Sequence, residues 1–168
     1  MIRPAALVAA VLMAFAVPAA AASVPVQAAA DPGVSIEAVR AWLISKGGEV
    51  SAINRLEGET WISIDDDPLN WVIFFYSCEA DVCGDIQYTA SFSNPTITQG
   101  MINDWNRDHR FLKAFFVPGE AGGDPRAVVQ YDVLVHSADV AQLTDPTVLW
   151  LDLLAAFGTA VGYLAAPE

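Results

Sequence analysis

This chain is poor in the residues that most often carry metal and acid–base chemistry. Its 168 residues include only two cysteines and two histidines, and eight lysines and arginines stand against twenty aspartates and glutamates. A structural zinc site needs about four nitrogen, sulfur or carboxylate ligands in a recognisable spacing, so we expect no metal centre. The formal net charge of −12 repels phosphate backbones, which argues against a nucleic-acid partner.

Recognisable catalytic motifs are also missing. The sequence has no H-E-x-x-H metal motif, no G-x-S-x-G nucleophile turn and no glycine-rich phosphate loop. The histidines His109 and His136 therefore have no serine in the strained turn that a hydrolase triad needs. Residues 65–67 are three aspartates with Asn70 nearby, but they lack the spacing of a calcium loop, and a solvated turn is favoured. We expect a protein that is not an enzyme and that needs no cofactor.

Long apolar runs are scarce beyond the first thirty residues. Residues 5–17 are apolar and follow Arg3, and a small-residue cleavage pattern ends at Ala22. The run is shorter than the roughly 20 residues that a membrane-spanning helix needs, so a signal peptide over residues 1–22 is favoured over a membrane anchor. Cleavage as late as residue 30 is an open alternative. We expect a periplasmic or secreted protein, without integral membrane association after cleavage, whose single domain covers residues 31–168.

The two cysteines agree with export. Cys78 and Cys83 lie close together in the sequence YSCEADVCGD, and an oxidising compartment favours a disulfide between such a pair. A redox-active pair is the alternative, but that chemistry usually has two intervening residues and a depressed thiol pKa. The surrounding acids Glu79, Asp81 and Asp85 would instead raise a thiol pKa. We therefore predict a structural disulfide.

The hydrophobic pattern predicts an α+β fold with a twisted, mostly antiparallel sheet and flanking helices. The expected strands cover residues 49–56, 60–65, 70–77, 85–93, 111–117 and 127–135, and the expected helices cover 35–46, 97–108 and a terminal segment starting near 144. Thr96 and Gln99 have the spacing of a capping box for the middle helix. Thr144 or Asp145 is expected to cap the last helix. Its buried positions are expected to include Leu149, Leu153, Ala156, Phe157 and Val161.

One segment concentrates the scarce positive charge. Arg107, Arg110 and Lys113 follow each other closely near the end of the middle helix. In so acidic a chain, this basic patch could contact an acidic partner. The alternative is a helix C-terminus whose cations complement the negative end of the helix dipole. This alternative is favoured, and the patch is kept as a candidate contact surface.

The sequence resembles the YbjN family, a family of bacterial sensory transduction regulators, over most of the predicted domain. The resemblance rests on residues 71–76 (WVIFFY), 86–92 (IQYTASF), and 102–107 (INDWNR) followed by 110–116 (RFLKAFF). It implies a fold similar to type III secretion chaperones, frequent self-association and a binding or regulatory role, with no catalytic residues. The motif positions are interpreted as mainly architectural, with an asparagine satisfying strand ends: Ile102, Asn103, Trp105, Asn106 and Phe111.

Two functional hypotheses follow from these observations. The first is a non-enzymatic periplasmic binding, regulatory or chaperone-like module that acts through contacts with an unidentified protein partner. The second is a self-associating envelope structural or stress protein, such as a homodimer, without a discrete ligand. An apolar content of 54% favours an exposed apolar surface in either case.

Overall fold

The computed structural model of the chain describes residues 33–120 and 122–165. The predicted signal peptide lies outside the described residues. The helices and strands follow one another as β1 (Val34–Ser35), α1 (Ile36–Ser45), β2 (Glu49–Val50), β3 (Asn54–Leu56), β4 (Glu59–Asp65), β5 (Trp71–Glu79), β6 (Val82–Ser93), α2 (Gln99–Asp108), β7 (Lys113–Val117), β8 (Arg126–Leu134), the 3-10 helix η1 (Val140–Leu143) and α3 (Thr144–Ala160).

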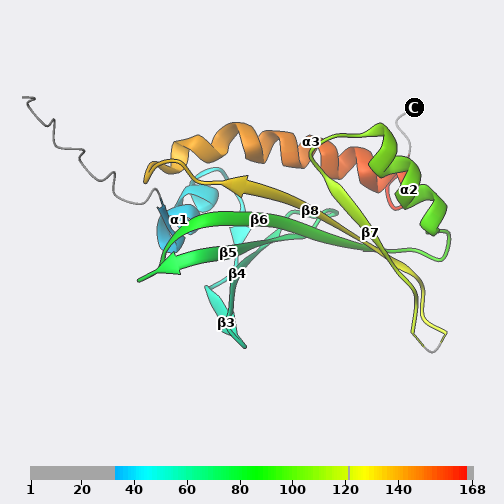
Figure 1. The fold of residues 1–168 in the computed structure, drawn as a ribbon, viewed down its shortest axis with the longest axis horizontal. Helices are drawn as coiled ribbons and strands as arrows, with labels where there is room; N and C mark the ends of the chain where they lie inside the picture. Colours follow the sequence, from blue (N-terminus) through cyan, green and yellow to red (C-terminus); the bar gives the residue numbers. More distant parts are fainter. Residues whose placement is uncertain (1–32, 121, 166–168) are drawn as a thin grey trace, which may run out of the picture.

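The strands form one curved antiparallel sheet. Its main path runs β2-β4-β5-β6-β8-β7, and β3 and β1 pair with β4 and β6 respectively. The β3–β4 hairpin and the β7–β8 hairpin extend downward in Figure 1, away from α3. The predicted α+β class with an antiparallel sheet is confirmed. Because the chain returns from α2 through β7, the strand β7 becomes the sheet edge, and β8 pairs with β6.

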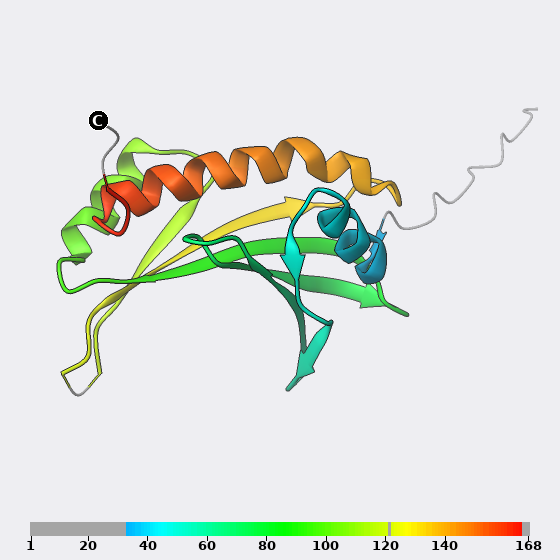
Figure 2. The ribbon, with the colours of Figure 1, turned by 180° about the vertical axis from the view of Figure 1, so that it is seen from behind.

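The helices gather on one side of the sheet, where the hydrophobic core lies (Figure 2). Alternate residues of β6 point toward α3, and all four are buried: Ile86, Tyr88, Ala90 and Phe92. The rings of Tyr88, Trp71 and Trp150 pack against one another, and the Tyr88 centroid lies 5.5 Å from that of Trp71 and 5.7 Å from that of Trp150. Its hydroxyl forms a 2.8 Å hydrogen bond with the Thr147 hydroxyl of α3. Burial of this phenol raises the pKa of Tyr88 to about 12.

A disulfide joins Cys78 to Cys83 across the β5–β6 hairpin. The turn beyond it consists of Ala80 and Asp81, which both have positive φ. Such a two-residue turn normally contains glycine, because a left-handed backbone costs other residues about 1 kcal/mol or more. The bridge closes a short loop and offsets this cost by about 2 kcal/mol in the chain-entropy model. It also fixes the strand against which β1 pairs.

Three sequence expectations about helix ends and faces are wrong. The cap of α2 is Thr98, whose hydroxyl accepts a 3.3 Å hydrogen bond from the Met101 backbone N–H. Thr96 instead bonds to Asn94 within a turn. The 3-10 helix η1 runs directly into α3, so neither Thr144 nor Asp145 caps it and its N-cap position is Leu143.

The buried stripe of α3 also differs from the expected one. It consists of Thr147, Trp150, Leu154, Phe157 and Gly158, while Ala156 is exposed and Leu149 and Leu153 are half-buried. The helix is rotated by one position because Trp150 and Thr147 must meet Tyr88. Phe157 and Val161 are buried as expected.

The strand β7 is shorter than expected because it starts at Lys113 rather than at residue 111. Phe111 has a φ of 71°, a left-handed conformation that cannot continue into a strand. Within the described residues, the helices are too short or too polar to cross a membrane.

Candidate functional site

One face of the sheet carries no helix among the described residues. We call it the open sheet face, and the strand register aligns its side chains in rows across the sheet. One row joins Trp61, Phe74, Gln87 and Asp132, and the next joins Ser63, Val72, Thr89, Gln130 and Lys113. A third row ends at Ser91, Val128 and Phe115, and Tyr76 belongs to the same face of β5. The open sheet face therefore mixes apolar and neutral polar groups with the paired charges of Lys113 and Asp132, and the acids Glu59 and Asp65 lie on the same face of β4.

Aromatic rings form a stripe along one side of the open sheet face. The ring centroids of Trp61 and Phe74 are 6.1 Å apart, and those of Phe74 and Tyr76 are 6.5 Å apart. Tyr76 is 42% exposed, and Phe115 on the edge strand β7 is 46% exposed. Burial and the nearby carboxylates of Glu59 and Asp132 raise the pKa of Tyr76, so its hydroxyl stays neutral and can donate a hydrogen bond at neutral pH.

The centre of the open sheet face is held by a polar network. Gln87 and Lys113 each donate a 2.6 Å hydrogen bond to Asp132, one to each carboxylate oxygen. These bonds lower the pKa of Asp132, the Lys113 ammonium being the largest cause. The lysine is thus already paired with a carboxylate on this face. Its charge is locally compensated, which leaves the face close to neutral here.

A groove of about 880 Å³ lies at one end of the open sheet face, between β2 and the sheet centre. Its apolar lining includes Val50, Val72 and Phe74, and its neutral polar lining includes Thr89 and Ser91. The charged residues that line it are Glu49 and Asp65. Apolar walls with a few polar groups are typical of sites that bind a ligand or a side chain.

The wall of the groove at β2 is fixed by α1. The chain leaves β2 at Ser51, whose backbone N–H and hydroxyl oxygen both bond to Ser63 of β4. From α1, Arg40 donates a 2.7 Å hydrogen bond to the Ser51 carbonyl and pairs with Glu37. Arg40 therefore stabilises the wall of the groove at Ser51, and its charge is already paired with that of Glu37.

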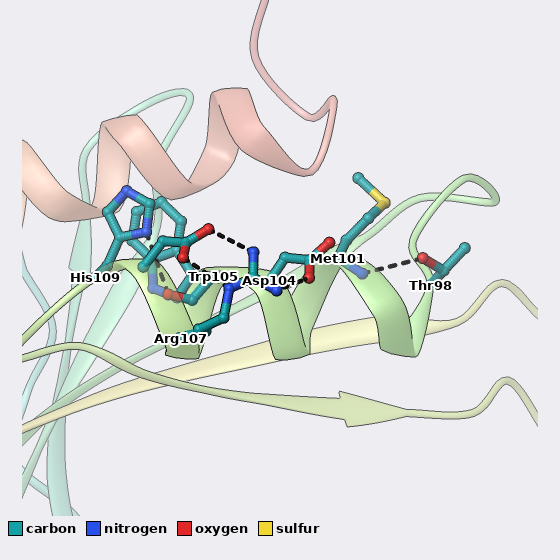
Figure 3. A network of polar contacts seen from close by, with 7 residues as sticks. Thr98, Met101, Asp104, Trp105, Arg107 and His109 are labelled. Carbon is teal, nitrogen blue, oxygen red and sulfur yellow. Dashed lines mark hydrogen bonds and ion pairs between the residues drawn. The ribbon is translucent and has the colours of Figure 1, made fainter.

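The members of the predicted basic patch lie in different surroundings. Arg107 on α2 forms ion pairs with Asp104 and Asp108, at 2.7 Å each (Figure 3). These bonds raise the pKa of Arg107 and lower that of Asp108. Arg110 lies over the exposed ring of Phe111, 4.9 Å from its centroid. Since Lys113 belongs to the open sheet face, the structure does not gather the three cations into one uncompensated surface.

The motif residues of α2 hold the helix against the sheet and against α3. Asn106 forms two 2.9 Å hydrogen bonds with Ala114 of β7, donating to its carbonyl and accepting from its N–H. Its amide thus pairs with the sheet edge as a neighbouring strand would. Trp105 packs edge-on against Phe157 and stacks on His109 at 3.6 Å. Ile102 is buried beside them.

Three motif positions are exposed, and one of them, Asn106, is held by its two hydrogen bonds to Ala114. Asn103 lies on the outer side of α2, and Phe111 is 55% exposed. The architectural interpretation therefore describes Ile102, Trp105 and Asn106 better than it describes these two. Among residues 33–120 and 122–165, three or more His, Cys, Asp or Glu side chains nowhere cluster in a way that could hold a metal ion.

Sequence reasoning did not single out the open sheet face, although the signal was present. The strand β5 is apolar on both of its faces, with Trp71, Ile73 and Phe75 toward the helices and Val72 and Phe74 on the other side. Such a strand is usually covered on both faces. Here the described helices cover only one face, which leaves Val72 and Phe74 on a face without a described helix (Figure 2).

Comparisons with known proteins agree with the sequence motifs. A search of curated proteins found no match. Among solved structures, the chain is similar to that described as "Crystal structure of YbjN, a putative transcription regulator from E. coli", with a TM-score of 0.50 and 14% identity, covering 76% of this chain and 88% of that one. This likeness supports the fold. The model of the YbjN family, described as "Putative bacterial sensory transduction regulator", matches residues 35–162, and the chain therefore belongs to the YbjN family.

Proposed function

We propose that this chain is a periplasmic, non-enzymatic regulatory module that acts through protein–protein contacts, and that the open sheet face is its contact surface. The family description as a regulator agrees with a role in binding rather than in catalysis. The observation that carries the proposal is that β5 is apolar on both faces while the helices cover one.

The composition of the open sheet face suits a protein partner. Interface centres are enriched in aromatic residues and depleted in charges, and this face has Trp61, Phe74, Tyr76 and Phe115 around a compensated Lys113–Asp132 pair. Tyrosine and tryptophan are the residues that most often dominate binding energy. The edge of β7 is already paired with Asn106, so we expect side chains of the face, rather than strand addition at β7, to make the contact.

The disulfide supports a periplasmic location. Bridges between cysteines persist in oxidising compartments and are rare in the cytoplasm, and Cys78 is joined to Cys83 here. The signal peptide predicted over residues 1–22 is the route of export. A fusion to an enzyme that is active only after export, carrying or lacking residues 1–22, tests the location. Activity that does not depend on these residues would contradict it.

Affinity capture tests the contact surface. The tagged full-length chain is crosslinked in cells, and its partners are compared between the wild type and a Tyr76→Ser, Phe115→Ser variant. Both side chains are more than 40% exposed, so the variant should fold. Val148→Ser is the matched control, because Val148 is 55% exposed on α3. We expect one envelope protein to be recovered with the wild type and the control and lost with the double variant.

The alternative outcomes have distinct meanings. Recovery of only the bait as its own crosslinked dimer favours the self-associating envelope protein. Equal recovery of the partner with all variants contradicts the open sheet face. The basic patch is tested in the same way with Arg107→Glu and Arg110→Glu: loss of the partner there, with folding intact, would place the contact on α2.

A further inference from the structure

We propose that the groove at the β2 end of the open sheet face binds a cationic segment of the partner protein, in which a lysine or arginine stands next to an apolar side chain. This inference rests on the proposed function and names the partner's chemistry. It combines three features of the groove: apolar walls, an acidic rim and an unfavourable pair of like charges within that rim.

The groove offers an apolar surface that a side chain can cover. Val72 and Phe74 are half-buried on the open sheet face and line the groove. Val50 also borders the groove, but it is the register partner of the buried Ile64 and packs against the core. A partner side chain that removes these apolar groups from water gains binding free energy from the hydrophobic effect. The volume of about 880 Å³ is large for a bare ion and suits a polypeptide segment with several side chains.

The rim places two carboxylates directly opposite each other. Glu49 and Asp65 are register partners in the β2–β4 pair, so their side chains share one face of the sheet, and both are exposed. Like charges at directly opposite positions destabilise an antiparallel pair. The sequence thus retains a local conflict beside an apolar groove, and such conflicts concentrate at functional sites. A cation held between the two carboxylates would remove the repulsion.

The surroundings reinforce the negative charge of the rim. Asp66 and Asp67 follow Asp65 directly, and this loop is held by a hydrogen bond from the Asp66 N–H to the Asn70 side chain. Arg40, which bonds to the Ser51 carbonyl next to β2, is already paired with Glu37. The local charge therefore selects a positively charged occupant.

Charge also argues against a second copy of this chain as the occupant. The chain has a net charge of −12 and only eight lysines and arginines. Four of these, Arg40, Arg55, Arg107 and Lys113, form ion pairs within the described part of the chain. A copy would bring an acidic surface to an acidic rim, which like-charge repulsion disfavours.

Peptide binding to the purified oxidised protein tests the proposal. The probe is a fluorescent nine-residue peptide that alternates lysine with valine and phenylalanine, and the comparison peptide has glutamate at every lysine. We expect the lysine peptide alone to bind, with an affinity that falls as salt is raised. Reversal of the rim with Glu49→Lys and Asp65→Lys should weaken binding about tenfold, because two attractions are replaced by two repulsions between exposed charges.

The control variant carries the same change of net charge elsewhere. Glu120→Lys with Asp152→Lys changes two exposed acids away from the groove and should leave peptide affinity unchanged. Equal weakening by the control and the rim variant, or equal binding of the glutamate peptide, would overturn the proposal. Calcium alone binding to the wild type and not to the rim variant would also overturn it, in favour of a metal ion.

A second measurement does not depend on the peptide. Glu49→Gln relieves the repulsion between the register partners, so it should raise the midpoint of thermal unfolding at low salt by about 2 °C. The same variant should also bind the lysine peptide more weakly than the wild type does. A lowered midpoint would contradict the like-charge argument. If cellular capture depends on Tyr76 and Phe115 but is unaffected by rim reversal, the groove proposal fails while the proposed function stands. If the capture of every partner is unaffected both by the Tyr76→Ser, Phe115→Ser variant and by rim reversal, the proposed function itself fails.

Discussion

Asn106→Ala removes the two hydrogen bonds that pair α2 with the edge of β7. The variant leaves the N–H and carbonyl of Ala114, both 2.9 Å from the asparagine amide, without their partner. A fully buried unsatisfied group costs about 1–3 kcal/mol, but this site is half-buried and water can reach it. We therefore expect the free energy of unfolding to fall by about 1–2 kcal/mol for the pair. With a urea m-value of about 2 kcal/mol/M, the unfolding midpoint should fall by about 0.5–1 M.

The same helix supplies the control. Asn103 is exposed on α2, and Asn103→Ala should change stability by less than about 0.5 kcal/mol. Asn106→Asp should be intermediate at neutral pH, because a carboxylate accepts from the Ala114 N–H but cannot donate to its carbonyl. Equal urea midpoints for the Asn106→Ala and Asn103→Ala variants would refute the assignment of Asn106 as the partner of the sheet edge.

Three further predictions concern pH and redox conditions. Because the pKa of Tyr88 is raised to about 12 in the folded protein, its contribution to stability is complete below pH 10 and is lost as the pH rises toward 12, by about 1.4 kcal/mol per pH unit. In urea unfolding, the Tyr88→Phe variant should lack this loss of stability at alkaline pH. The same dependence of the unfolding free energy on pH in the variant and the wild type would contradict the prediction. The lowered pKa of Asp132 gives the opposite sign, so its contribution is present above the ordinary aspartate pKa and lost as the pH falls through the folded value. Asp132→Asn should therefore lower the free energy of unfolding by less than about 1 kcal/mol at neutral pH. The difference in unfolding free energy between this variant and the wild type should disappear in acid, and a difference that persists there would contradict a stabilising ion pair. Reduction of the disulfide should lower the free energy of unfolding of the wild type by about 2 kcal/mol. A reducing agent should not change the stability of a variant with Cys78→Ala and Cys83→Ala. An equal effect of the reducing agent on both proteins would show that the bridge does not stabilise the fold.

The sheet and its buried face could be predicted because local patterns determine them. The alternation of β6 marks Ile86, Tyr88, Ala90 and Phe92 as the core face, and the apolar run of β5 marks an interior strand. The Glu57-Gly58 turn has positive φ at both residues, as a two-residue hairpin requires. Each of these features depends on residues that are close in the sequence.

The features that sequence reasoning missed depend on contacts between distant residues. Thr96 and Thr98 are both plausible caps, and Thr98 is used because Asn94 holds Thr96 in a turn. The rotation of α3 follows from Tyr88, which lies far away in the chain and bonds to Thr147. A helical period alone cannot choose between neighbouring apolar stripes.

The candidate site was harder to predict from the sequence than the helix ends and faces. The basic patch is contiguous in sequence, but the fold gives Arg107 two aspartate partners and places Lys113 beside Asp132. The groove, in contrast, brings together Glu49 and Asp65 from strands that pair only in the folded chain. Surface charge is set by which elements meet, and strand order is what the sequence pattern leaves open.

Site-specific photocrosslinking in cells tests most directly whether the open sheet face contacts a protein partner. A photoreactive side chain is placed at Gln87, at the centre of the face, or at Asp152, which is exposed on α3. We expect an adduct with one envelope protein from position 87 and none from position 152, and mass spectrometry should map the crosslinked segment of the partner. An adduct from position 152 alone, or no adduct from position 87, would contradict the assignment of the open sheet face as the contact surface.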